Sequence, residues 1–189
     1  MQMTGVSLLG WVHSAACMLA LLLGGALLLG PKGTARHKRL GRLYFYTMLA
    51  VNLSVFGIYH FDVVIARPPR VGPGLFGIFH WEATVTLLVL LLGFYAASRQ
   101  RRAIWAYVHP FSMLFTYYML VGGLINELFV RVHVLRAIAA TQLHSGQNVA
   151  QTPVVGLSQF AAMIFFIVLL VYYMAKVALY RRRARLAAA

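Results

Sequence analysis

Five long apolar stretches, separated by polar connections, dominate this chain and limit what it can fold into. Each reaches the roughly 20 apolar residues that a helix needs to cross the hydrocarbon core of a bilayer. Hydrophobic residues make up 61% of the chain and charged residues 11%, so water is a poor solvent for it. The longest connection, 131–153, has room for a short surface helix before Pro153. The sequence predicts an all-α polytopic transmembrane helical bundle, one domain over 1–189, with spans at about 6–30, 43–66, 75–98, 108–130 and 154–179.

The basic residues lie between the apolar stretches and predict the orientation of the chain. The connection 31–42, the connection 99–107 and the tail from Lys176 onward hold 13 of the 17 Lys and Arg residues, and the alternate connections hold 4. Because positively charged loops stay in the cytoplasm, we expect the N-terminus outside and the basic tail 180–189 inside, against the lipid bilayer. The net charge of +14 does not indicate a nucleic-acid binder, whose basic residues would gather on one face.

The first stretch follows no basic leader and is longer than the core of a signal peptide. We therefore expect it to remain as a span rather than be cleaved. It contains Cys17, the chain's only cysteine, which excludes an intramolecular disulfide and a cage of cysteine ligands. We interpret Cys17 as a thiol packed between helices.

Ionisable residues are scarce within the apolar stretches and gather near the predicted outer surface. An ionisable side chain at the bilayer centre costs roughly 2.5–3.5 kcal/mol on insertion scales, so each one within a span calls for a role. All three acids of the chain lie near outer span ends, and three histidines share their depth to within about one helical turn. The members of this outer layer are His13, His60, Asp62, His80, Glu82 and Glu127.

The imidazole and carboxylate groups of the outer layer predict a transition-metal site for Zn, Fe, Mn or Cu. A carboxylate near each histidine would supply the partner that its second ring nitrogen requires. Haem b is the alternative cofactor, because two of His13, His60 and His80 at equal depth on facing helices would ligate its iron. A third interpretation is structural, since the same residues would anchor span ends or form hydrogen bonds between helices. The sequence leaves these three interpretations open.

The fourth stretch carries a polar stripe along one helical face. Such a stripe faces protein or water rather than lipid, either as the packing seam of the bundle or as a proton path between the membrane faces. We favour the seam, because Gly122 and Gly123 allow close helix packing. The stripe consists of His109, Ser112, Thr116, Gly123 and Glu127.

Several short motifs between residues 30 and 131 occur in the order found in a known family. They are Lys32-Gly33-Thr34, His37-Lys38-Arg39-Leu40-Gly41-Arg42-Leu43-Tyr44, Met48, Phe79-His80, His109, Met113, Tyr117, Gly122-Gly123, Glu127 and Arg131. In these motifs the chain resembles the bacterial membrane proteins catalogued as domain of unknown function 2306. The resemblance implies a multi-pass protein of the bacterial inner membrane, without implying a reaction or a ligand. It highlights His37, His80, His109 and Glu127.

Three functions compete on this basis. The first is metal-assisted chemistry or metal handling near the periplasmic face, and whether the protein is an enzyme stays open. The second is a b-type cytochrome that transfers electrons between a quinone and a partner. The third is a non-enzymatic membrane subunit, assembly factor or transporter. A site near the outer leaflet would meet lipid, quinone or a periplasmic small molecule, and Ala20 and Gly24 allow helix packing within one chain or in an oligomer.

Overall fold

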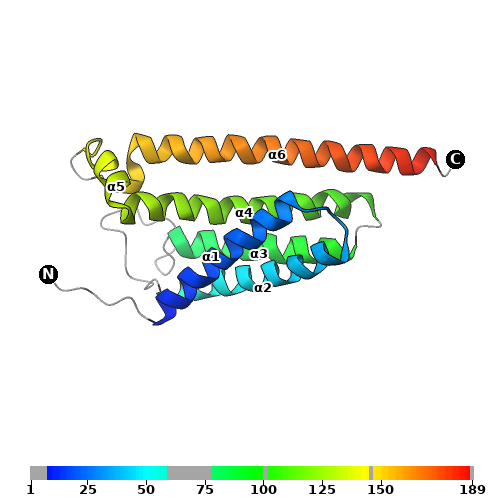
Figure 1. Cartoon of the computed structure of the whole chain (residues 1–189), viewed down its shortest axis with the longest axis horizontal. Coiled ribbons are helices and arrows are strands. Elements are labelled where there is room, and N and C mark those ends of the chain that lie inside the picture. The colour runs from blue at the N-terminus through cyan, green and yellow to red at the C-terminus, as the bar shows by residue number, and fades with distance from the viewer. Residues whose placement is uncertain (1–7, 59–77, 100–101, 145–146, 188–189) are drawn as a thin grey trace. The chain divides into compact units, whose positions relative to one another are not determined.

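A computed structural model of the chain describes residues 8–58, 78–99, 102–144 and 147–187. Over these residues the chain consists of helices and the turns between them, which confirms the predicted all-α class (Figure 1). The helices are α1 (Leu8–Leu29), α2 (Ala35–Ile58), α3 (Ile78–Ser98), α4 (Ala103–Arg131), α5 (His133–Ala140) and α6 (Pro153–Leu186), with a short 3-10 helix, η1 (Val149–Gln151).

Four helices within the described residues are long and apolar enough to cross a membrane, namely α1, α3, α4 and α6. They overlap four of the five predicted spans. α2 differs from them because its first two turns are basic, and the rest of the predicted second span, residues 59–66, lies outside the described residues. The fifth span stays a prediction.

The chain divides into two compact units, residues 1–94 and residues 95–189. In the first unit α1 and α2 pack as an antiparallel hairpin. Leu9, near the start of α1, lies against Gly57, near the end of α2, and a Cβ at Gly57 would come within 2.6 Å of Leu9 Cδ2. The missing side chain at Gly57 therefore permits the close approach of the two helices.

The turn between α1 and α2 uses residues with special backbone properties. Pro31 has no backbone N–H and cannot continue α1, and Gly33 adopts a φ of +79°, in the left-handed region that favours glycine. Thr34 caps α2, because its Oγ1 accepts a 3.1 Å hydrogen bond from the backbone N–H of His37. Most of the basic connection predicted over 31–42 is therefore helical.

α2 and α3 also run antiparallel within the first unit. Phe45 stacks on Phe94 with ring centroids 4.1 Å apart, and Phe56 contacts His80 with ring centroids 5.5 Å apart. The later residue of α2 thus contacts the earlier residue of α3, as expected for antiparallel helices. The buried residues of α2 recur at helical spacing. They are Tyr44, Phe45, Thr47, Met48, Val51 and Asn52.

In the second unit α4 and α6 pack along each other, and α5 with η1 joins them at one end (Figure 1). Phe129, Ala139 and Val155 form a small buried core at that junction, with one residue from each of the three helices. α5 is the surface helix predicted for the connection 131–153.

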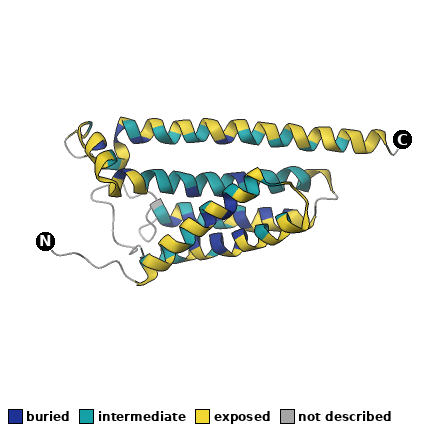
Figure 2. Cartoon of the chain, viewed as in Figure 1, coloured by how far each residue is buried: buried dark blue, intermediate teal, exposed yellow. Residues whose placement is uncertain are grey.

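α6 is longer than the span predicted at 154–179. Its 34 residues correspond to about 51 Å at 1.5 Å per residue, whereas the hydrocarbon core of a bilayer is about 30 Å thick. Its side chains are mostly exposed or half-buried (Figure 2). The predicted basic tail is helical as far as Leu186, so α6 carries Arg183 and Arg185 in its last turn.

Candidate functional site

The predicted outer layer is distributed over both units. His13, His80 and Glu82 belong to the first unit, and Glu127 belongs to the second. Among the described residues, no three His, Cys, Asp or Glu side chains come together in a group able to hold a metal ion. The layer as a whole stays a prediction, since two members lie outside the described residues. These are His60 and Asp62.

His13 contacts α2 through one nitrogen of its ring and a residue of its own helix, α1, through the other. Nδ1 lies 2.7 Å from Oγ of Ser54, and Nε2 lies 3.4 Å from Sγ of Cys17. The Ser54 hydroxyl donates its single proton to the carbonyl oxygen of Val51 at 2.8 Å. We therefore assign Ser54 as the acceptor of a hydrogen bond from Nδ1–H of His13. This assignment is the neutral tautomer in which Nε2 holds the lone pair and faces the Cys17 thiol.

The separation of His13 Nε2 and Cys17 Sγ is that of a hydrogen bond and also matches the spacing of two ligands of one metal ion. The residues are four apart on α1, so their side chains share one face of the helix. In a tetrahedral zinc site with ordinary bond lengths, a nitrogen and a sulfur ligand are about 3.5 Å apart, close to the 3.4 Å between these atoms. Ser54 supplies the hydrogen-bond partner that a ligating histidine needs at its other nitrogen.

His80 is the most deeply buried of the described layer residues, with 1% of its surface exposed. Its ring contacts Phe56, and its carbonyl oxygen accepts a 2.7 Å hydrogen bond from Thr84. Ser54 and Phe56 are two residues apart on α2, so their side chains point about 200° apart. His13 and His80 therefore contact α2 at one level but from different sides.

The two described carboxylates differ in their surroundings. Glu82 is half-buried on α3. Glu127 forms an ion pair with Arg131, one turn later on α4, and the side chains of Glu127 and Arg131 are 49% and 70% exposed. An exposed pair of this kind contributes little to stability. It gives Glu127 a cationic partner without a metal ion.

The contact between α4 and α6 involves a polar side chain outside the predicted stripe. Gln159 of α6 donates hydrogen bonds to the carbonyl oxygen of Gly122 at 2.9 Å and to Oδ1 of Asn126 at 3.1 Å. Ser112 and Thr116, two members of the stripe, are fully buried and lie about 80° and about 120° around the helix from Gly122. The hydrogen bonds from Gln159 thus reach α4 at Gly122 and Asn126, and the role of the stripe stays a prediction.

Cys17 and Ser54 are the two site residues that the sequence analysis did not assign. The spacing of four between His13 and Cys17 was a usable signal, since such residues meet on a helix face. Ser54 gave no local signal, because it lies 41 residues from its partner and reaches it only through the pairing of α1 with α2.

No protein-family model, curated protein or solved structure gives a significant match to this chain. The resemblance to domain of unknown function 2306 stays a prediction.

Proposed function

We propose that this protein binds a transition-metal ion near the outer ends of its first two membrane spans. The observation that carries the proposal is the pairing of His13 Nε2 with Cys17 Sγ while Ser54 holds the opposite ring nitrogen. A thiolate and an imidazole together favour Zn or Cu among the four predicted metals, because Mn prefers oxygen ligands. His60 and Asp62 follow Ser54 in the chain and are the proposed further ligands.

The proposed topology has five spans, the fifth being α2 with its continuation through residues 59–66. Four helices long and apolar enough to cross a membrane support the other spans. With this number the positive-inside rule puts the N-terminus in the periplasm of a bacterial inner membrane and the Arg-rich end of α6 in the cytoplasm. The metal site would then lie near the periplasmic face.

The number of protein ligands separates the two roles open to such a site. Four protein ligands close the coordination sphere of a tetrahedral ion, which suits metal storage, delivery or structural binding. Three protein ligands leave a position for water or a substrate oxygen, which suits metal-assisted hydrolysis. Binding requires the Cys17 thiol to lose its proton, so metal uptake releases a proton to solvent.

Metal content tests the proposal directly. The protein is purified in neutral detergent, saturated with Zn and desalted, and the bound metal is measured by mass spectrometry. We expect about one ion per chain in the wild type. In His13→Gln we expect less than about a tenth of that, because the ligands that remain in the variant bind the ion weakly without the imidazole. Ser14→Ala is the matched control, because Ser14 is exposed beside His13. A wild type without bound metal overturns the proposal.

Two additional measurements separate the alternatives. A haem absorption band in the wild-type protein would move the function to electron transfer, with two of the histidines as axial ligands. His80→Ala tests whether His80 shares the site with His13, because a shared site would lose the metal in both variants. Retention of metal in His80→Ala would assign His80 to helix packing.

Surface labelling tests the topology. In a Cys17→Ser background, single cysteines replace Thr34 and Gln147. Both residues are exposed, and each lies in a polar connection. A membrane-impermeant maleimide added to intact cells should label the cysteine at position 147 and spare the one at position 34. The opposite pattern would invert the proposed orientation.

A further inference from the structure

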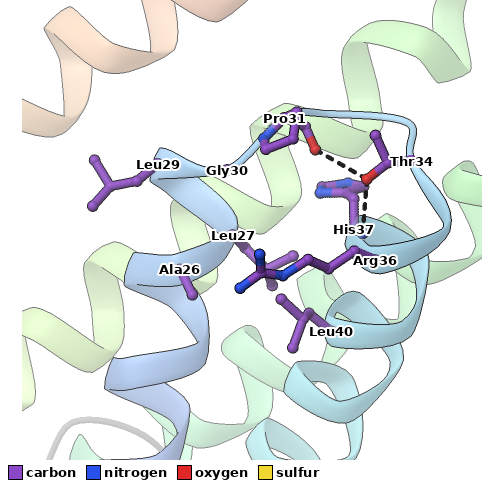
Figure 3. A pocket seen from close by; sticks show the side chains of 9 residues that line it. All are labelled: Ala26, Leu27, Leu29, Gly30, Pro31, Thr34, Arg36, His37 and Leu40. Carbon is purple, nitrogen blue, oxygen red and sulfur yellow. Dashed lines mark hydrogen bonds between the residues drawn. The ribbon is translucent and has the colours of Figure 1, made fainter.

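The first unit contains a cavity at the turn between α1 and α2, at the end away from His13 (Figure 3). Its volume is about 240 Å³. One part of its wall is apolar and another carries basic side chains. The lining residues are Ala26, Leu27, Leu29, Gly30, Pro31, Thr34, Arg36, His37 and Leu40.

Positive charge predominates in the sequence of this turn. Residues 31–42 include five Lys and Arg residues and no Asp or Glu. The acid Glu127 pairs with Arg131 in the second unit. The charge at the turn therefore attracts anions from outside the chain. The basic residues are Lys32, Arg36, Lys38, Arg39 and Arg42.

Lys32 and Arg36 have different surroundings at the turn. Lys32 Nζ donates to the carbonyl oxygens of Leu27, Leu28 and Gly30 at 2.7, 2.8 and 2.9 Å, so its charge serves the end of α1. Arg36 lines the cavity, and its side chain extends from the start of α2 toward α1 (Figure 3). Arg36 is exposed, which leaves its guanidinium accessible to a ligand.

We propose that this cavity binds the phosphate-bearing headgroup of an anionic phospholipid. The guanidinium of Arg36 matches a phosphate with two parallel hydrogen bonds. Leu27 and Leu40 give the first carbons of the acyl chains an apolar surface. The apolar stretch of α1 ends at Leu29, so the cavity lies where hydrocarbon gives way to headgroups.

The lipid site is independent of the metal site at the other end of the hairpin. Free inorganic phosphate carries the same charged group but lacks the acyl chains that would contact Leu27 and Leu40. A lipid site should therefore prefer a phospholipid over phosphate, and an anionic phospholipid over a zwitterionic one.

Native mass spectrometry of the detergent-purified full chain tests the proposal with phosphatidylglycerol as the probe. We expect one phosphatidylglycerol to remain bound per chain, with affinity at least about tenfold weaker in Arg36→Gln, which loses the bidentate contact. Arg39→Gln is the matched control, because it removes one exposed charge from the same turn of α2 without touching the cavity. Its affinity should change by less than about threefold.

A cavity-filling variant separates a shaped site from general charge attraction. Ala26→Trp leaves every basic residue in place and fills the cavity from α1, so it should displace the lipid as Arg36→Gln does. Circular dichroism checks that both variants keep the helical content of the wild type. Equal losses in Arg36→Gln and Arg39→Gln would overturn the proposal, as would equal binding of phosphatidylcholine or full displacement by millimolar phosphate.

Discussion

Nδ1 of His13 and Oγ of Ser54 lie 2.7 Å apart, and this hydrogen bond orients the imidazole ring and thereby its other nitrogen, Nε2. Nε2 is turned toward Cys17 on the same helix. A rotation of α1 by one residue would move His13 by about 100° and break the bond. The geometry of the candidate site therefore depends on the register in which α1 and α2 pack together.

Ser54→Ala should weaken metal binding without removing a ligand. The substitution leaves Nδ1–H of His13 without its acceptor on α2, so the ring is free to turn away from Cys17. Loss of such a supporting hydrogen bond typically costs 10- to 100-fold in metal affinity, and we expect a decrease of about that size. Competition with a chromophoric chelator measures it. Thr47→Val, which removes a hydroxyl bonded to Leu43 O within α2, should leave the affinity unchanged.

Gln159 and Asn126 should be energetically coupled. Gln159→Leu removes the hydrogen bonds that cross from α6 to α4, and Asn126→Ala removes one of their acceptors. Hydrogen bonds between membrane helices average about 0.6 kcal/mol, up to about 1.7, and a coupling energy in this range is expected. A double-mutant cycle of unfolding in mixed detergent gives the value. Ser158→Ala is the control, since its hydroxyl bonds to Val154 O within α6; additive effects of Gln159→Leu and Asn126→Ala would contradict the contact.

Glu127→Gln should have little effect on stability or on metal content. The carboxylate pairs with Arg131 one turn away, and both side chains are largely exposed. A pair of this type is worth less than about 0.5 kcal/mol, so the unfolding midpoint should shift only slightly. Bound metal should also stay at the wild-type level. If metal content falls in Glu127→Gln while His13→Gln retains it, the site belongs to the second unit instead.

Lys32→Met should loosen the end of α1. The variant keeps the length of the side chain but removes three hydrogen bonds to the carbonyl oxygens of Leu27, Leu28 and Gly30. A cation at a helix C-terminus is worth about 0.3–1 kcal/mol, and we expect a loss of stability of that order. Hydrogen exchange at the turn should accelerate. Lys38→Met, on an exposed position of α2, should not accelerate it.

The positions of the helices were predictable from the sequence where a helix coincides with a long apolar stretch. α1, α3, α4 and α6 coincide with apolar stretches long enough to cross a bilayer, and the short helix α5 fits the length of its connection. The start of α2 was not predictable in this way. Its first two turns are basic, and the helix begins there because Thr34 caps it rather than because it is apolar.

The sequence indicated the level of His13 and His80 along the helices, but not the side of α2 that each of them contacts. His13 and His80 contact α2 within two residues of each other, which agrees with their predicted common depth. The side of α2 that each contacts depends on helix rotation and register, which no single stretch encodes. Cys17 was interpreted only as a packed thiol, because hydrophobicity does not distinguish a packed thiol from one that the proposal makes a ligand.

The turn between α1 and α2 bears on how the chain enters the bilayer during synthesis. Its stabilising contacts, from Lys32 to the end of α1 and from Thr34 to the start of α2, join residues at most five positions apart. Such contacts form as soon as the turn leaves the ribosome, before α3 exists. In the proposed five-span topology, the first two helices would therefore insert as a preassembled pair, and the basic turn would stay on the cytoplasmic side, where the chain is synthesised.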